Sequence, residues 1–237
     1  MNRETWLPWL RDGTRPGRRS AYPLPPANSR PAVALLEDPR LRASTTSTEE
    51  LAVDRAMLVA LAGDATSADP AALIRLFVAT MMWGSGTTYG RGPRRTAEAL
   101  SADNLADVLL ETRDAVHTDD LVSAHRAFSV QGVGESFFTK WFWTASLDRE
   151  DQRRPLILDN RVRAVLHRIL GSHPSWKVHR GGAGYDAYVA VIHDAADALS
   201  PTFPHIDAEK IEWLMFDRSD HKHVAEVCLD GAVGTSG

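Results

Sequence analysis

Residues 130–162 constrain the fold of this 237-residue chain more than any other stretch. The stretch opens with Gly132-Val133-Gly134, and two glycines so close together permit a tight turn because glycine tolerates positive φ angles. A run of phenylalanines and tryptophans follows, too continuous in its apolar character for a half-buried surface strand. The sequence therefore predicts a largely buried helix over 135–147.

A second helix start closes the same stretch. The polar segment 148–154 and Pro155 interrupt the apolar run, and proline opposes the interior of a helix because it lacks a backbone donor. Asp159 then stands directly before a new amphipathic pattern, where a carboxylate can accept hydrogen bonds from the first N–H groups of a helix. We therefore expect a helix over 161–170 with Asp159 as its N-cap.

The glycine turn has two physical interpretations. A Gly-x-Gly turn at a helix start directs free backbone N–H groups outward, and the helix dipole adds positive potential there. Such an arrangement suits a phosphate group. A corner between two helices with no ligand uses the same three residues, so the turn alone leaves both interpretations open.

The combination of the turn, a later lysine and a capping aspartate resembles the helix-hairpin-helix DNA glycosylase superfamily, and within it the 8-oxoguanine DNA glycosylase branch. The residues that carry the resemblance are Gly132-Val133-Gly134, Lys140 in the following helix, and Asp159 after a short apolar run. The interval between the lysine and the aspartate is close to the interval usual in that family.

The resemblance is clear over 125–170, weaker elsewhere and absent from the first 45 residues. It departs from the family pattern at one place. In the best-known members the lysine stands two places after the second glycine, but here that place is Ser136 and Lys140 follows one turn later. Since residues four apart share a helix face, Lys140 is placed to reach the same pocket. A surface position or a contact with the DNA backbone is the alternative for this lysine.

The resemblance implies a DNA glycosylase that flips a damaged base, in the first place 8-oxoguanine, out of double-stranded DNA. It implies that Asp159 stabilises the positive charge developing on the deoxyribose. It also implies that Lys140 forms a Schiff base and so permits strand cleavage as an AP lyase. The residues expected to contact the DNA backbone are Gly132, Val133, Gly134, Ser136 and Arg161.

A glycine-rich segment over 82–92 is a second candidate region. Its glycines allow a ligand to approach the backbone, and Trp83 and Tyr89 offer rings that can stack on a base. The arginines at its end and just after it, Arg91, Arg94 and Arg95, would add contacts to phosphates. A simple helix connector with Trp83 in the core is the alternative. No strand precedes the segment, which argues against a dinucleotide fingerprint. The residues of the predicted base pocket are Trp83, Gly84, Tyr89 and Trp141.

Composition narrows the remaining classes of protein. The formal net charge of −4 argues against a large nucleic-acid footprint, although a local basic face is compatible with it. A single cysteine, Cys228, excludes a disulfide framework and a four-cysteine iron–sulfur cluster. His221 and His223 point different ways on a helix, and no zinc motif is present, so we expect neither a metal nor another cofactor. With no apolar run of about 18 residues and no visible signal peptide, we expect a cytoplasmic, nucleoid-associated monomer.

Apolar residues recur at helical spacing from residue 48 onward, with almost no β-alternation. The predicted fold class is mainly α: about ten helices in two lobes around a central cleft, with the hairpin at 130–134 on one rim. Proline and arginine dominate the start of the chain, and dense proline opposes long helices. The predicted divisions are a proline- and arginine-rich extension over 1–45, a helical domain over 46–230 and a disordered tail over 231–237. Further helices are expected over 48–63, 70–83, 94–102, 104–113, 118–129 and 185–199, and after Asp207.

Two other functions stay open at this point. The first is a monofunctional glycosylase for another modified base, such as a hypermodified phage base, in which Asp159 activates water. The second is a non-catalytic helix-hairpin-helix DNA-binding module, which the acidic net charge and the shifted Lys140 favour. A carboxylate that faces DNA argues against a pure binder, because it repels phosphates.

Overall fold

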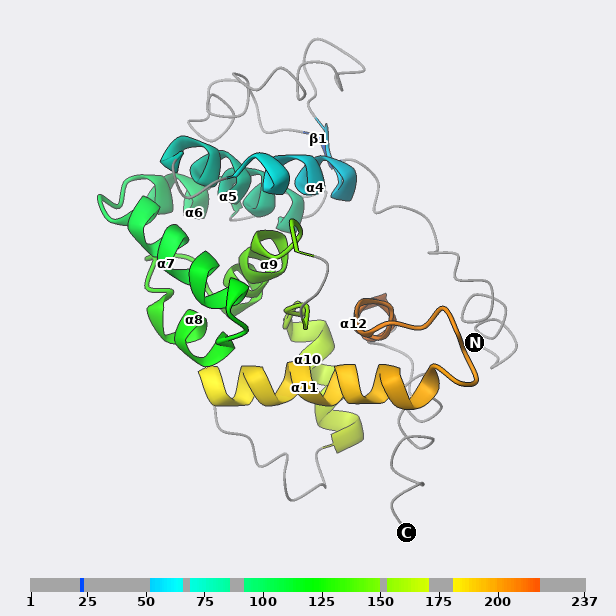
Figure 1. Ribbon diagram of the computed structural model, residues 1–237. Coiled ribbons are helices and arrows are strands. Elements are labelled where there is room, and N and C mark those ends of the chain that lie inside the picture. Colours follow the sequence, from blue (N-terminus) through cyan, green and yellow to red (C-terminus); the bar gives the residue numbers. More distant parts are fainter. Residues whose placement is uncertain are drawn as a thin grey trace. The chain divides into compact units, whose positions relative to one another are not determined.

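The computed structural model describes residues 22–23, 52–65, 69–85, 92–149, 153–170 and 181–217. These residues are mainly helical: nine α-helices and one two-stranded antiparallel sheet lie among them (Figure 1). The predicted mainly α fold class is confirmed, whereas the cleft between two lobes stays a prediction. None of the helices within the described residues is long and apolar enough to cross a membrane.

The chain divides into two compact units, with the boundary after residue 152. We call the described residues before the boundary the lysine unit and those after it the aspartate unit, after Lys140 and Asp159. The elements of the lysine unit are β1 (Tyr22–Pro23), β2 (Ala52–Val53), α4 (Arg55–Asp64), α5 (Pro70–Gly84), α6 (Gly92–Leu100), α7 (Leu105–His117), α8 (Leu121–Ala127) and α9 (Glu135–Ala145). Helix α5 is the centre of this unit, because it contacts α4, α6, α7 and α9.

Short-range capping sets where the helices of the lysine unit begin. The Asp69 carboxylate accepts a hydrogen bond of 2.9 Å from the backbone N–H of Ala71, and Pro70 occupies the first helical position. Proline suits this position because its fixed φ is already helical and its missing N–H would have no partner there. The predicted helix over 70–83 is confirmed by α5.

Two predicted helix starts are wrong. The helix expected over 48–63 begins at Arg55, because residues 52–53 pair with residues 22–23 as strands and Asp54 caps the helix through the Met57 N–H. The helix expected over 118–129 begins at Leu121, where Asp120 accepts from the Ser123 N–H at 2.9 Å. In both cases a carboxylate further along the chain is the true N-cap.

The core of the lysine unit is aromatic where α5 meets α9. The Trp83 and Trp143 rings are stacked, with centroids 5.3 Å apart, and the guanidinium of Arg55 lies 4.8 Å from the Trp143 centroid. Phe77 meets Trp141 edge to face at 6.0 Å. Such pairs add to the burial of apolar area, so they hold α9 firmly against α5.

The aspartate unit starts with an extended segment over 153–159 that leads into α10 (Asn160–Leu170). It continues with α11 (Gly182–Leu199), the longest helix of the described chain, and α12 (Ala208–Asp217), which contacts both α10 and α11 (Figure 1). Asp207 caps α12 by accepting from the Lys210 N–H at 2.7 Å, as predicted. The expected helices over 161–170 and 185–199 are confirmed as well.

Candidate active site

The glycine turn before α9 uses its two glycines differently. Gly132 has φ 80°, which favours glycine, whereas Gly134 has φ −82° and extended backbone. A Cβ placed on Gly132 would lie 2.8 Å from Oε2 of Glu98, but no described atom lies within 4 Å of a Cβ placed on Gly134. The turn itself therefore requires Gly132, while Gly134 leaves open space at the start of α9.

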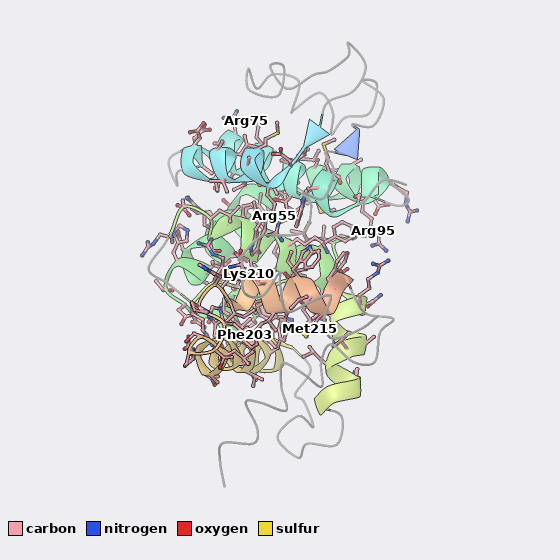
Figure 2. The ribbon with its side chains drawn as sticks, turned by 90° about the vertical axis from the view of Figure 1, so that its right-hand side faces the viewer. Arg55, Arg75, Arg95, Phe203, Lys210 and Met215 are labelled. Atoms are coloured by element: carbon pink, nitrogen blue, oxygen red, sulfur yellow. The ribbon has the colours of Figure 1, made fainter. Side chains whose placement is uncertain are left out.

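Helix α6 brings charged side chains, and α8 brings an imidazole, to the start of α9. Nε2 of His125 lies 3.2 Å from Oε1 of Glu135 in the first turn of α9. Nε of Arg94 lies 3.6 Å from Oε1 of Glu98, the same glutamate that lies beside Gly132. The guanidinium of Arg95, labelled in Figure 2, lies 6.0 Å from the Phe137 ring centroid. Two of the three arginines predicted to contact phosphates thus lie close to the turn, and Arg91 falls outside the described residues.

Burial and backbone hydrogen bonds hold the glycine turn in place within the lysine unit. Val133 is buried, and its N–H donates to the Val130 carbonyl at 3.2 Å. Gly134 is the N-cap residue of α9 and offers no side-chain cap. Its carbonyl accepts hydrogen bonds from the N–H groups of Phe137 and Phe138. The backbone of the first turn of α9 is therefore held in place, and only the N–H groups ahead of Phe137 precede the hydrogen bonds to the Gly134 carbonyl.

Lys140 is a buried residue, with 5% of its surface exposed. Its side chain runs back along α9, and Nζ donates a hydrogen bond of 2.7 Å to the carbonyl oxygen of Ser136. Long side chains on helices turn toward the N-terminus in this way. The amino group also lies 5.6 Å from the Phe137 ring centroid. The lysine amine thus reaches the level of residue 136, although Lys140 stands four residues later.

Gly84 makes room for the lysine. A Cβ placed on Gly84 would lie 2.7 Å from Cδ and 3.4 Å from Cε of Lys140. The stem of Lys140 therefore occupies the space that a side chain on the last residue of α5 would need. The structure brings together Gly84, Ser136 and Lys140, three residues that sequence analysis assigned to separate roles.

The two tryptophans of the predicted base pocket lie in the core instead. Trp83 is stacked on Trp143, and Trp141 is fully buried, with its Nε1 donating to Oγ1 of Thr112 at 2.9 Å. Helices α5 and α9 are apolar on several faces because other helices surround them, so aromatic residues there serve packing. Neither indole presents an open face for a base in this structure. Tyr89 lies outside the described residues.

Asp159 stands at the N-terminus of α10, as predicted. Its Oδ1 accepts hydrogen bonds from the N–H groups of Arg161 at 2.9 Å and Val162 at 3.0 Å. The carboxylate is therefore held by the backbone of the helix that it caps. Arg161, predicted to contact DNA, is exposed, and its guanidinium lies 5.0 Å from the Phe216 ring centroid on α12.

The segment that leads to Asp159 is buried, and no strand among the described residues pairs with it. The hydroxyl of Tyr185 donates to the Leu156 carbonyl at 2.7 Å, and that of Tyr188 donates to the Ile157 carbonyl at 3.1 Å. Nε2 of His193 lies 2.9 Å from the Arg154 carbonyl oxygen. A buried carbonyl without a partner costs about 1–3 kcal/mol, so these side chains of α11 replace the ladder of a neighbouring strand.

Ion pairs fix the beginning of the same segment. Arg153 pairs with Asp186 of α11, and Nε of Arg154 lies 3.2 Å from Oε1 of Glu209 on α12. The sequence pattern does not indicate these contacts, because each joins residues far apart in the chain. Both helices that follow α10 therefore hold the segment ahead of Asp159.

One buried carboxylate on α12 escaped sequence analysis. Glu212 stands among the apolar residues of α12 and is only 2% exposed. Burial raises the pKa of Tyr188 well above its ordinary value, and the negative charges of Glu212 and Asp159 act in the same direction, as does Tyr185. The Tyr188 hydroxyl therefore keeps its proton and stays a donor. Nothing in the residue pattern around Glu212 signals its burial.

No group of three or more histidine, cysteine, aspartate or glutamate side chains in the described ranges could hold a metal ion. His221 and His223 lie outside those ranges.

The helical fold agrees with a comparison against protein families. A family model covers residues 2–216, so the chain belongs to a family of DNA glycosylase-like proteins. That family is described as "Putative 8-oxoguanine DNA glycosylase OGG-like protein". The resemblance to the 8-oxoguanine branch is thereby confirmed. No curated protein and no solved structure matches the chain.

Proposed function

We propose that this protein excises a damaged base, 8-oxoguanine in the first instance, from double-stranded DNA, with Lys140 as nucleophile and Asp159 as the stabilising carboxylate. The position of the lysine amine carries the proposal. Its Nζ lies 2.7 Å from the Ser136 carbonyl oxygen, at the place two residues after the second glycine where the family has its lysine. Although Lys140 stands one turn later in the sequence, its amine lies beside the backbone of residue 136, which supports its assignment as the nucleophile.

The chemistry assigned to Lys140 is attack on C1′ of the flipped nucleotide. A bond forms between Nζ and C1′ while the glycosidic bond breaks and the base leaves with the bonding electrons and takes up a proton. One proton then passes from the nitrogen to O4′ as the C1′–O4′ bond breaks, and the nitrogen lone pair forms the C=N bond of a protonated Schiff base, which permits strand cleavage by β-elimination. The burial of Lys140 supports this role, because nucleophilic lysines act from sites shielded from water.

The role assigned to Asp159 is electrostatic. Cleavage of the glycosidic bond develops positive charge on the deoxyribose, and a carboxylate held in advance stabilises that charge. The two backbone hydrogen bonds to Oδ1 support this role, because they fix the carboxylate before DNA arrives.

The contact assigned to the glycine turn is a DNA phosphate. The open space beside Gly134 allows close approach to the first N–H groups of α9, and the helix dipole favours an anion there. Arg94 and Arg95 of α6 supply positive charge nearby, although Glu98 and Glu135 offset part of it. A phosphate at this place needs no large basic surface, which fits the net charge of −4.

Borohydride trapping on duplex DNA that contains 8-oxoguanine tests the proposal. We expect a covalent adduct with the wild type that is absent in Lys140→Ala. Asp159→Asn should slow base release by about 10²–10³-fold, as removal of one stabilising group does. Asp207→Asn is the matched control, because it changes another N-cap aspartate of the same unit and asparagine caps equally well.

Two results would change the proposal. Alkali-labile abasic sites without any adduct, abolished in Asp159→Asn, would identify a monofunctional glycosylase in which Asp159 activates water. No base release from 8-oxoguanine or from a panel of other modified bases would overturn the enzymatic proposal. Gel-shift binding to undamaged duplex would then support a helix-hairpin-helix binding module.

A further inference from the structure

The approach to Asp159 is an extended chain that no neighbouring strand supports within the described residues. Pro155, Leu156, Ile157 and Leu158 are all buried, so the carbonyls of this segment need partners inside the protein. The hydroxyls of Tyr185 and Tyr188 supply them at 2.7 Å and 3.1 Å.

The two tyrosines act as a pair because of their spacing. Tyr185 and Tyr188 stand three residues apart and so share one face of α11. They bind two consecutive carbonyls, those of Leu156 and Ile157, which precede Asp159 by three and two residues. Fixing two adjacent peptide groups restricts the backbone dihedrals that determine where the next residues lie.

We propose that Tyr185 and Tyr188 are positioning residues for the Asp159 carboxylate, acting through the carbonyls of Leu156 and Ile157. The inference rests on the function proposed for Asp159. Helix α10 fixes the carboxylate from one side through the Arg161 and Val162 N–H groups. The tyrosine pair fixes the chain from the other side, so that Asp159 has little freedom to turn away from the sugar.

The surroundings of Tyr188 agree with this role. Burial, Glu212, Tyr185 and Asp159 all raise the pKa of Tyr188, so its hydroxyl remains a donor throughout the neutral and mildly alkaline range. The hydrogen bond to Ile157 is thus insensitive to the pH at which base excision is measured.

Single-turnover base excision by Tyr188→Phe and Tyr185→Phe tests the inference, since phenylalanine keeps the ring and removes only the hydroxyl. We expect Tyr188→Phe to lower the maximal rate about tenfold, within the range that ångström displacements of a reacting group produce, with the Kd for DNA unchanged. Tyr185→Phe should have a smaller effect. His193→Phe should have the smallest, because its partner carbonyl at Arg154 is five residues from Asp159.

A double variant separates positioning from general loosening of the fold. If Tyr188 acts through Asp159, Tyr188→Phe should cause no further loss of rate in the Asp159→Asn background. A rate loss that persists in that background would overturn the inference. An unchanged rate together with a lower Tm would overturn it too, since the hydroxyl would then serve stability alone.

Amide hydrogen exchange supplies a readout that needs no activity. The N–H groups of Arg161 and Val162 report directly on the Asp159 carboxylate, and those of Val189 and Ile192 on α11 serve as the reference. We expect Tyr188→Phe to accelerate exchange at Arg161 and Val162 severalfold more than at the reference positions. If the wild type excises no base but this pattern appears, the proposed function fails while the positioning stands. Equal acceleration at all four amides would overturn the positioning.

Discussion

In the lysine unit, the amine of Lys140 binds within its own helix, to the Ser136 carbonyl one turn back, and its stem lies in the space left by Gly84 on α5. In the aspartate unit, Asp159 ends an extended segment whose carbonyls are bound by Tyr185 and Tyr188, about thirty residues later in the chain. A helix can place a side chain by its periodicity, because neighbours at i and i+4 meet whatever else the protein does. An extended buried segment has no such internal support, so other elements must position its end.

The two residues should therefore respond to different changes. Lys140 should respond to changes in the space around its stem, because its backbone is fixed by the ladder of α9. Asp159 should respond to the loss of distant hydrogen bonds while its own side-chain contacts stay intact. The following predictions test this contrast, beginning with the largest effect.

Gly84→Ala should disturb Lys140 with little change in stability. The added Cβ would lie 2.7 Å from Lys140 Cδ, and the flexible lysine stem can move more easily than the backbone of α5. Moving the amine by about an ångström should lower the rate of adduct formation by about 10²-fold. Trapping kinetics measure the rate, and thermal melting should show a change of only about 1 kcal/mol.

Gly63→Ala is the matched control for that experiment. Gly63 lies in α4 with no described atom within 4 Å of an added Cβ, so alanine should stabilise the helix by up to about 1 kcal/mol without altering the rate. If Gly84→Ala trapped DNA as fast as Gly63→Ala, the space beside Gly84 would have no part in placing the lysine.

Thr112→Val should lower stability and leave the chemistry unchanged. It removes the acceptor of the buried Trp141 N–H, which costs about 1–3 kcal/mol in the free energy of unfolding. Chemical denaturation measures the loss, and base excision from several lesions measures selectivity. A shift in lesion preference, rather than in stability, would support the sequence-based prediction that Trp141 belongs to the base pocket.

Alkaline pH should weaken the aspartate unit through Tyr188. Its pKa in the folded state is raised above the unfolded value of about 10, so its contribution to stability is complete below that pH. Above it, the unfolded chain loses the proton while the folded protein keeps it, and stability falls by up to about 1.4 kcal/mol per pH unit until the folded pKa is reached. Urea denaturation from pH 9 to 11 should show a shallower decline for Tyr188→Phe than for the wild type. Parallel declines would show that the pKa of Tyr188 is not raised in the folded state.

The parts of the fold that sequence predicts well are those set by neighbouring residues. Asp69 before Pro70, Asp159 before α10 and Asp207 before α12 each cap a helix through N–H groups only two or three residues away. The reach of Lys140 to residue 136 follows from helix geometry in the same way. Such contacts leave their signature within one turn of the chain.

The parts that sequence misses depend on what packs against a residue. Tyr185 and Tyr188 stand at a helical spacing that is typical of packing, but their hydroxyls donate to carbonyls 29 and 31 residues earlier in the chain. Glu212 is a charged residue within an apolar pattern, which by itself favours an exposed position. The packing of α12 buries it instead. Strand β2 displaced a predicted helix start because it pairs with residues 22–23.

The stacked tryptophans of α5 and α9 have an optical consequence. Two indoles 5.3 Å apart and inclined by 21° are close enough to couple their electronic transitions, and the Arg55 cation lies 5.7 Å and 4.8 Å from their ring centroids. The near-ultraviolet circular dichroism and fluorescence of this pair therefore register the contact between the helix that ends at Gly84 and the helix that carries Lys140. Trp143→Phe would remove that signal and leave the lysine in place. The tryptophan pair is therefore an internal probe of when the helix that carries Lys140 packs against α5 during folding.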